Sequence, residues 1–290
     1  MTDELYGGIE AGGTKFVAVV GSGPDDIIDR LRVDTTDPAT TIGACLDFFD
    51  RHAGIRSIGI ASFGPLELRK SHPEYGRITK TPKPLWSGAD LVGPFSKRFG
   101  VPVAIETDVN GAALAEVRWG AARGLGNAVY LTVGTGVGGG AVVDGRPVSG
   151  LVHPEMGHVS VVRRPGDDFA GICPFHGDCL EGLASGPAIA ARWGKPAEEL
   201  GDVEAVVEIE AETIASGLRQ VVYVLAPERI VFGGGVSKLP AIHDAVSRAL
   251  IDEMSGYAII EEHRGGFVVP PGLGDDAGVS GALALAMDVA

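Results

Sequence analysis

The chain has 290 residues, of which 45% are hydrophobic and 21% charged, as is typical of a globular protein long enough to form two lobes. Its formal charge of −14 argues against a nucleic-acid binder, which would show a basic face, and an anionic substrate would need backbone amides, a lysine or a divalent cation. The 44 glycines are about twice the usual share and indicate many tight turns.

The N-terminal stretch MTDELYGGIE lacks the basic and apolar regions of a signal peptide. No apolar stretch reaches the about 18 residues that cross a bilayer. We therefore expect a cytoplasmic protein with no membrane partner. In a reducing compartment, Cys173 and Cys179 of the stretch CPFHGDC favour a metal-binding thiol pair over a disulfide. A coincidental pairing stays open.

The first part of the chain predicts three strands, a helix and a fourth strand. Their ranges are 5–10, 15–21, 27–33, 35–54 and 57–65. Cap-type residues, an early proline, apolar residues at helical spacing and a closing glycine indicate the helix. Residues 62–100 are rich in Pro, Gly and Lys and lack periodicity, which predicts a long functional loop. A strand over 100–108 then leads into a helix over 109–120.

The rest of the chain repeats this plan. We predict strands joined by tight turns within 127–148, short strands within 228–237 and 267–270, and helices at about 180–193, 204–225, 240–254 and 276–287. Each half opens with a strand, a Gly/Thr turn and a second strand. This pattern indicates a duplicated α/β architecture with a cleft between two lobes.

Three glycine-rich turns lie at strand ends. They comprise Gly12, Gly13, Thr14 and Lys15; Gly134, Thr135 and Gly136; and Gly233, Gly234 and Gly235. Successive amide groups in such turns can bind phosphate oxygens. The first turn lacks the P-loop spacing, and each turn alone could be an ordinary hairpin turn that needs positive φ. Three such turns in a duplicated plan favour a nucleotide site.

These stretches resemble the ROK family of sugar kinases, in the actin and hexokinase superfamily of ATPases. The matching stretches, in family order, are GIEAGGTK, TDVNGAALAE, LTVGTGVGGG, HPEMGH, CPFHGDCLEGLASGPA and VFGGGV. The stretch LGDDAGVSGALALA matches the C-terminal helix of the family. The SFGP and TPK stretches and the C-x2-H-x2-C cluster look most like bacterial fructokinases of this family.

The resemblance implies a two-lobed actin/hexokinase-like fold made of duplicated RNase H-like α/β domains around a cleft. Residues 1–107 would form the N-terminal lobe, with a C-terminal helix at about 275–290 packing back on it. Residues 108–274 would form the C-terminal lobe, with a zinc-bearing insertion at about 151–181 that shapes the sugar site.

The resemblance also implies ATP between the lobes, with Mg²⁺ offsetting the acidity of the chain at the phosphates. The phosphates would lie on the turns at Gly12–Thr14 and Gly134–Gly136. Adenosine would lie near Gly233–Gly235 and the helix start at Gly186 and Pro187.

The catalytic base of the family maps onto Asp108, at the junction of a strand and a helix. Without the resemblance, an ordinary helix N-cap would account for this aspartate. The family usually has Asn-Asp here, and Thr107 replaces the asparagine that normally holds a sugar hydroxyl, which puts glucokinase specificity in doubt. Glu10 stands where the family commonly has Asp, and its longer carboxylate could still reach a water on magnesium.

By resemblance, Glu155, His158 and Glu181 bind the sugar hydroxyls. Carboxylates accept hydrogen bonds from hydroxyl groups, so such a site rejects a sugar with the wrong hydroxyl arrangement. A solvated surface pair is the alternative for the two glutamates.

A Cys2His2 set of Cys173, His176, Cys179 and His158 suits one tetrahedral structural Zn²⁺ per chain. Most of the family uses three cysteines with the same histidine. If His158 binds zinc through one ring nitrogen, the other can face the sugar. His153 is an alternative ligand that the sequence leaves open.

The resemblance therefore implies an ATP-dependent hexose kinase, a phosphotransferase with an alcohol acceptor, and most specifically a fructokinase. Glucokinase, mannokinase and N-acylmannosamine kinase are alternatives within the family. A sugar-binding regulator without kinase activity is an alternative of another class, and a homodimer is expected by family analogy alone.

Overall fold

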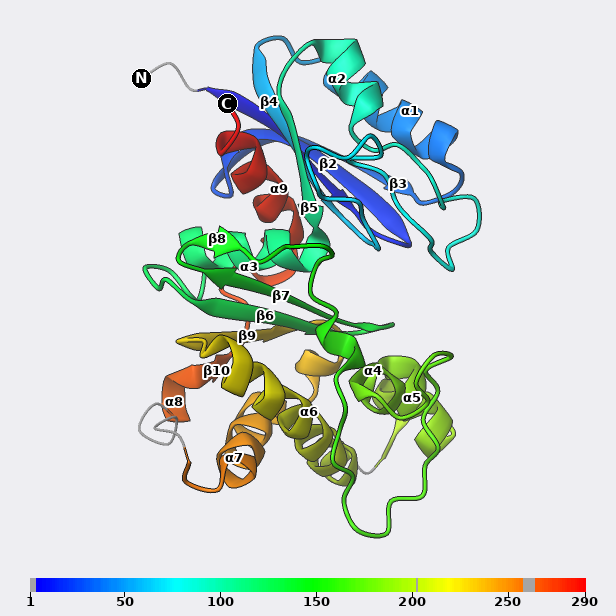
Figure 1. Cartoon of the computed structure of the whole chain (residues 1–290), viewed down its shortest axis with the longest axis vertical. Helices are drawn as coiled ribbons and strands as arrows, with labels where there is room; N and C mark the ends of the chain where they lie inside the picture. Colours follow the sequence, from blue (N-terminus) through cyan, green and yellow to red (C-terminus); the bar gives the residue numbers. More distant parts are fainter. Residues whose placement is uncertain (1–3, 202, 258–263) are drawn as a thin grey trace.

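Each half of the chain folds around a five-stranded sheet, as the computed structural model in Figure 1 shows for residues 4–201, 203–257 and 264–290. The first half contains β1 (Leu5–Ala11), β2 (Lys15–Gly23), β3 (Asp26–Asp34), α1 (Pro38–Phe49), β4 (Ile55–Ser62), α2 (Gly93–Phe99) and β5 (Val103–Thr107). Then follow α3 (Asp108–Arg118), β6 (Ala128–Val133), β7 (Val137–Val143), β8 (Arg146–Pro147), η1 (Met156–His158), α4 (Leu180–Ala184), α5 (Gly186–Trp193) and η2 (Ala197–Glu199). The last described elements are α6 (Val203–Leu225), β9 (Arg229–Gly233), η3 (Val236–Lys238), α7 (Ile242–Met254), α8 (Arg264–Phe267), β10 (Val268–Val269), η5 (Gly274–Asp276) and α9 (Ala277–Met287).

The two sheets have the same topology. Their strand orders are β3-β2-β1-β4-β5 and β8-β7-β6-β9-β10. In each sheet the first three strands in chain order pair antiparallel. The fourth strand pairs in parallel with the first strand, and the fifth strand pairs in parallel with the fourth. This correspondence confirms the predicted duplication of one α/β unit.

Local sequence accounts for the elements of the first sheet. The last six residues of β4 are all buried, as expected for a parallel strand covered on both faces, whereas the edge strand β3 alternates exposed and half-buried positions. The helix α1 begins after Asp37, whose carboxylate accepts a hydrogen bond from the Thr40 N–H, and Pro38 occupies its first turn.

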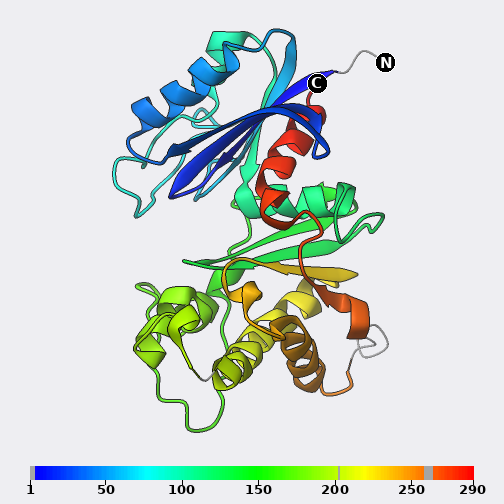
Figure 2. The ribbon, with the colours of Figure 1, turned by 180° about the vertical axis from the view of Figure 1, so that it is seen from behind.

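Helices α3 and α9 pack together between the two sheets, and α9 also lies against β1 and β4 of the first sheet (Figure 2). Their contact is close because glycines meet: a Cβ built on Gly281 would lie 2.3 Å from the carbonyl oxygen of Gly111. Small alanines dominate the surrounding core cluster. The final helix of the chain therefore joins the two halves.

A buried carboxylate fixes the segment that precedes α9. Glu116 of α3 is fully buried and accepts hydrogen bonds from the N–H groups of Ala121 at 2.6 Å, Gly272 at 3.0 Å and Leu273 at 3.0 Å. Hydrogen bonds to a charged acceptor are about twice as strong as neutral ones. Glu116 therefore holds the 270–274 segment at the N-terminal side of α9 against α3.

Two predicted elements differ from the structure. The single helix expected at 180–193 is two helices, because Ser185 takes an extended backbone conformation, ends α4 and caps α5 by accepting from the Ala188 N–H. The loop expected over 62–100 ends in the short helix α2, which starts at a Gly-Pro pair and stops at Gly100 with positive φ. Among the described residues, no helix is long and apolar enough to cross a membrane.

Glu210 in α6 should make the stability of the fold depend on pH. It is 0% exposed, neither carboxylate oxygen has a hydrogen-bond partner among the described residues, and burial raises its pKa well above the usual value, with Arg192 opposing the rise. Above the usual pKa, the unfolded chain ionises while folded Glu210 stays protonated. The free energy of unfolding should therefore fall as pH rises, by about 1.4 kcal/mol for each unit between the two pKa values.

Urea unfolding at pH 5 and pH 8 checks this expectation with Glu210→Gln as the matched variant. The variant should lose less stability than the wild type between the two pH values. Parallel losses in both proteins would show that Glu210 does not titrate in this way.

Candidate active site and metal centre

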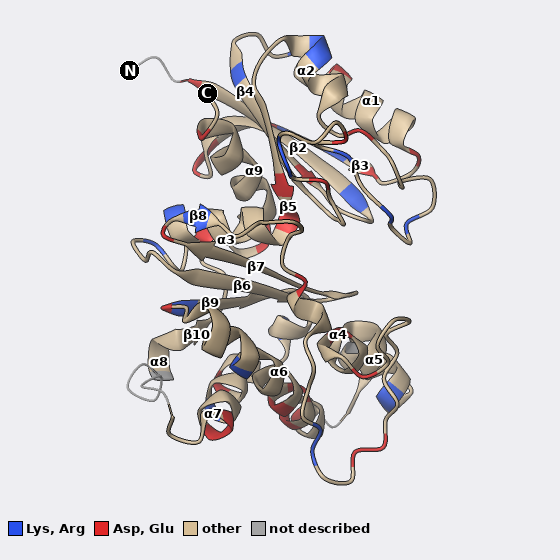
Figure 3. Ribbon diagram, viewed as in Figure 1, with Lys and Arg blue, Asp and Glu red and all other residues tan. Residues whose placement is uncertain are grey.

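A cavity of about 570 Å³ opens between the two halves, where β1, α3, β6, β9 and the start of α9 meet. Its charged lining residues are Glu10, Asp108 and Asp275, with Lys15 and Lys238. Figure 3 shows acidic residues near the end of β5, where the halves approach each other. The remaining lining residues are Val109, Ala112, Tyr130, Thr132, Gly233, Gly234, Ser237, His243, Pro270, Pro271, Gly274, Ala277 and Gly278.

Asp108 is the first residue of α3 and faces this cavity. Its Oδ1 accepts a hydrogen bond from the Val109 N–H at 2.9 Å. Burial raises the pKa of Asp108 to about 7, and the nearby carboxylates of Glu10 and Glu155 add to the rise, while the Val109 N–H opposes it. A carboxylate whose pKa lies near neutral pH is well suited to accept a proton.

The N-cap of α3 is Thr107. Its hydroxyl oxygen accepts from the Asn110 N–H at 3.2 Å, so helix capping does not account for Asp108. The Thr107 side chain is nearly buried, at 4% exposure, and its hydroxyl keeps its hydrogen and one lone pair for a sugar.

Glu10 places a second carboxylate in the cavity. Burial raises its pKa, and Lys15 opposes the rise. The longer side chain has room because α9 carries glycine opposite it: a Cβ on Gly278 would lie 2.5 Å from the Glu10 Cδ. The first turn of α9 thus lies against this carboxylate. Oxygen ligands at this position are of the kind that Mg²⁺ prefers.

Two of the three glycine turns come together beside the start of α5. The Gly186 N–H donates to the Gly134 carbonyl oxygen at 2.7 Å, which places Pro187 next to the Gly134–Gly136 turn. Gly234 has a φ of +90°, and a Cβ there would lie 2.4 Å from the Val133 carbonyl oxygen. Only glycine fits this turn.

The predicted nucleotide-binding residues separate into two groups. Lys15, Gly233 and Gly234 line the cavity itself. The others lie outside its lining: Gly12, Gly13, Thr14, Gly134, Thr135, Gly136, Pro187 and Gly235. Gly13, Thr14 and Thr135 are exposed at their turns, so a ligand can reach these positions.

The predicted sugar ligands lie on η1 and its flanks and on α4. The Glu181 Oε2 accepts from the Val137 N–H at 3.1 Å, so α4 is tied to the strand that follows the Gly134–Gly136 turn. The Glu155 side chain is 52% exposed and its charge contributes to the raised pKa of Asp108. Both carboxylates keep an oxygen for a sugar hydroxyl.

The four predicted metal ligands converge. One ligand atom from each of His158, Cys173, His176 and Cys179 lies within 4.8 Å of all the others. The His158 Nδ1 is 3.5 Å from the Cys179 Sγ and 3.8 Å from the Cys173 Sγ, and the His176 Nδ1 is 3.8 Å from the Cys173 Sγ. A tetrahedral zinc ion with bonds of about 2.0–2.3 Å holds its ligands roughly 3.3–3.8 Å apart. The donor set fits zinc in type and spacing.

The geometry distinguishes the two histidines that the sequence left open. His158 contributes Nδ1 to the cluster, so its Nε2 remains available. His153 lies outside the cluster, and its Nε2 accepts from the Leu66 N–H at 3.2 Å.

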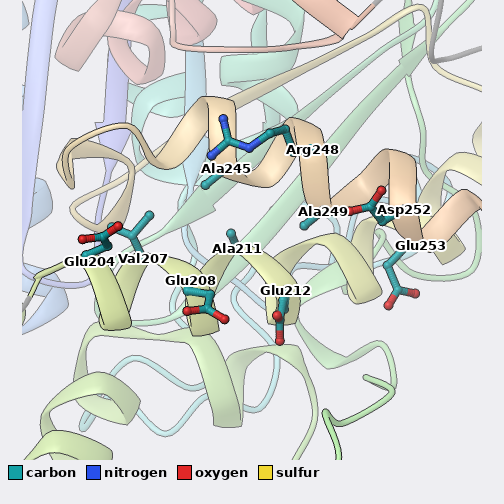
Figure 4. A pocket seen from close by; sticks show the side chains of 10 residues that line it. All are labelled: Glu204, Val207, Glu208, Ala211, Glu212, Ala245, Arg248, Ala249, Asp252 and Glu253. Atoms are coloured by element: carbon teal, nitrogen blue, oxygen red, sulfur yellow. The ribbon is translucent and has the colours of Figure 1, made fainter.

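A second hollow, of about 530 Å³, lies on the outer face between α6 and α7 (Figure 4). Five of its lining residues are acidic: Glu204, Glu208, Glu212, Asp252 and Glu253. Arg248 is its one basic residue, and none of the predicted site residues lines it. This excess of negative charge disfavours a nucleotide.

Sequence reasoning did not single out several residues that line the cavity. Tyr130, Thr132 and Lys238 are examples, with Lys238 paired to Asp275 at 3.2 Å. Lys238 follows the third glycine turn closely and could have been found from that turn. Tyr130 and Thr132 sit within an ordinary strand pattern, which gives no signal of function.

Comparison with known proteins identifies relatives along the whole chain. A ROK family model matches residues 6–289. The fructokinase of Zymomonas mobilis is 47% identical over an alignment of 295 residues, which covers 98% of this chain and 97% of that protein.

Two solved structures are similar in fold. The ROK hexokinase from Thermus thermophilus has a TM-score of 0.79 and 29% identity, with 98% of each chain covered. The ROK family glucokinase from Streptomyces griseus, in complex with glucose and AMPPNP, has a TM-score of 0.74 and 25% identity, with 98% of this chain and 99% of that chain covered. These similarities confirm the predicted two-lobed actin/hexokinase-like α/β fold.

Proposed function

Because this chain belongs to the ROK family, we propose that it is an ATP-dependent hexose kinase that converts D-fructose to D-fructose 6-phosphate. The observation that carries the proposal is Asp108, a carboxylate with a pKa of about 7 in the cavity between the two halves. The identity to a fructokinase over nearly the full length supports fructose as the acceptor. Because the proposed reaction needs ATP, we place the enzyme in the cytoplasm as part of this proposal.

ATP would bind between the halves. Its phosphates would contact the open turns at Gly12–Thr14 and Gly134–Gly136, with Lys15 contributing a positive charge. Adenosine would lie near Gly233–Gly235 and the start of α5 at Gly186 and Pro187. Glu10 is the residue of this chain that would hold Mg²⁺, through its carboxylate or a bound water, and the cation would neutralise charge on the phosphates.

The chemical step is an in-line phosphoryl transfer. Asp108 accepts the proton of the sugar O6 hydroxyl as that oxygen attacks the γ-phosphorus of ATP. The bond to the bridging oxygen breaks and ADP leaves, with the proton remaining on Asp108 until solvent takes it up. The protein contributes by positioning the reactants and by stabilising charge.

Glu155, Glu181 and the Nε2 of His158 would bind the sugar hydroxyls. Thr107 is the weakest member of this predicted set, because its oxygen caps α3 and its side chain is nearly buried. His158, Cys173, His176 and Cys179 would hold one structural Zn²⁺, which fixes the ring orientation of His158.

The division into lobes is also part of the proposal. Residues 1–107 and 275–290 would form one lobe, and residues 108–274 the other, with the insertion at about 151–181 carrying the sugar and zinc sites. Contacts of α9 with β1, β2, β4 and β5 of the first sheet support placing this helix in the first lobe. Closure of the lobes would exclude water from the phosphates.

A homodimer in solution is a further element of the proposal. Tyr223, Val224 and Tyr257 are exposed near the end of α6, and the two tyrosine rings stack edge to face at 5.9 Å. Exposed apolar surface of this kind supports a contact between proteins. Light scattering after size-exclusion chromatography measures the mass directly.

A coupled ADP-release assay tests the preferred sugar. Purified protein with ATP and magnesium should show its highest kcat/KM with fructose, and at least about ten-fold lower values with mannose, glucose and N-acetylmannosamine, because a site built from hydrogen bonds rejects the wrong hydroxyl arrangement. A higher value for another hexose would reassign the substrate within the family. Absence of turnover with every sugar would favour the non-catalytic sugar-binding regulator.

A further inference from the structure

His153 links the two halves of the molecule beside the sugar ligands. It precedes η1 in the second half and is 7% exposed. Its Nε2 accepts a hydrogen bond at 3.2 Å from the N–H of Leu66, which follows β4 in the first half. The ring lies against Gly64, where a Cβ would come within 3.1 Å of Nε2.

This contact selects one tautomer of the neutral ring. A backbone N–H can only donate, so Nε2 must be the unprotonated nitrogen and a neutral ring carries its hydrogen on Nδ1. Nδ1 lies 3.3 Å from the Pro154 carbonyl oxygen and 3.4 Å from the Glu155 Oε1. Nδ1–H can donate to the Pro154 carbonyl oxygen, and the Glu155 carboxylate lies within ion-pair distance of the same nitrogen.

The surroundings of the ring are otherwise acidic. Glu106 at the end of β5 is buried, which raises its pKa. The Glu106 Oε1 is already bonded to the Thr107 N–H and the Asn110 Nδ2. Glu155 is the carboxylate that lies close to Nδ1, at 3.4 Å.

We propose that His153 is a positioning residue that sets sugar affinity and selectivity by holding the Glu155 carboxylate in one orientation. The Leu66 N–H anchors the ring, the ring holds Oε1 of Glu155, and Oε2 is left to accept from a sugar hydroxyl. The inference rests on the proposed function, because Glu155 is a sugar ligand only within it.

Two substitutions at His153 distinguish the role of Nε2 from the role of Nδ1. Glutamine places its amide oxygen near the position of Nε2, so His153→Gln keeps the contact with Leu66 and loses the donor to Glu155. Asparagine places its amide nitrogen near the position of Nδ1, so His153→Asn keeps the donor and loses the anchor. We expect His153→Gln to raise KM for fructose about ten-fold and to reduce discrimination against mannose, because the contact between Nδ1 and the Glu155 carboxylate is lost. His153→Asn should raise KM less.

A double-mutant cycle with Glu155→Gln distinguishes orientation from packing. If His153 acts through Glu155, His153→Gln should raise KM for fructose by less than about two-fold in the Glu155→Gln background. His52→Gln is the matched control, since His52 is also partly buried and pairs with Asp29 at 3.0 Å in the first half. It should leave KM for fructose unchanged. Unfolding temperatures with and without fructose report folding and sugar binding independently of turnover.

The outcomes are separable. An unchanged KM in folded His153→Gln, a larger effect of asparagine than of glutamine, or full additivity with Glu155→Gln would each overturn the inference while leaving the kinase intact. A wild-type protein without hexose turnover would overturn the proposed function and this inference with it. Glu155→Gln with the wild-type KM would overturn the inference and remove Glu155 from the sugar site, while leaving the kinase intact.

Discussion

Asp108→Asn should lower kcat for fructose by about 10²–10⁴-fold, the usual contribution of a positioned general base. Asparagine keeps the size of the side chain and an oxygen that can accept from the Val109 N–H, so the start of α3 should be preserved. Steady-state kinetics with ATP, magnesium and fructose measure the loss. KM for fructose should change much less than kcat, because the group acts on the proton in the transition state.

The pH profile provides the control for this assignment. Asp108 accepts a proton only when ionised, so wild-type kcat/KM should rise with pH through an apparent pKa of about 7 and then level off. The residual kcat/KM of Asp108→Asn should not show this rise with pH. The unfolding temperature of the variant should equal or exceed that of the wild type above pH 7, because a buried carboxylate with a raised pKa destabilises the fold once it ionises. If the variant stays active and its kcat/KM rises with pH as in the wild type, Asp108 is not the general base.

Cys179→Ser should abolish stoichiometric zinc and loosen the insertion that carries His158. Cys179 is buried, and burial, with Cys173 beside it, raises the pKa of its thiol. We expect one zinc per chain in the wild type and much less in the variant. Loss of roughly 3 kcal/mol would lower the unfolding temperature by roughly 6–12 °C in a protein of this size.

Cys45→Ser is the matched control for the zinc prediction. Cys45 is also a buried free cysteine, but it lies in α1 and outside the cluster. The control should lose some stability and retain its zinc. We would measure the zinc content, the unfolding temperature and the KM for fructose of each protein, before and after chelation. A wild-type protein that contains no zinc and is unaffected by chelation would contradict the metal centre.

The positions of most strands and helices could be predicted because their signals are local. Period-two burial in β3, the continuous apolar run of β4 and the caps of α1 can all be recognised within a few residues. The break at Ser185 could not be recognised from periodicity, since the apolar pattern continues from α4 into α5. Adjacent cap-type residues at Thr107 and Asp108 likewise left the start of α3 open by one residue.

The contacts that build the site were beyond sequence reasoning because they join distant parts of the chain. Leu66 and His153 are 87 residues apart, and Glu116 and Gly272 are 156 residues apart. The motif HPEMGH drew attention to Glu155 and His158, whereas the role of its first histidine depends on a backbone N–H in the other half. The metal cluster could be predicted from the sequence because three of its ligands lie within seven residues of one another.

Phosphorus NMR of the reaction of ATP, magnesium and fructose with the purified, zinc-loaded protein would show whether the cavity transfers a phosphoryl group to the sugar. We predict growth of the D-fructose 6-phosphate signal in step with ADP, and its disappearance with Asp108→Asn. Release of inorganic phosphate alone, phosphorylation at another position of the sugar, or an unchanged ATP spectrum would contradict the assignment of this site as a fructokinase.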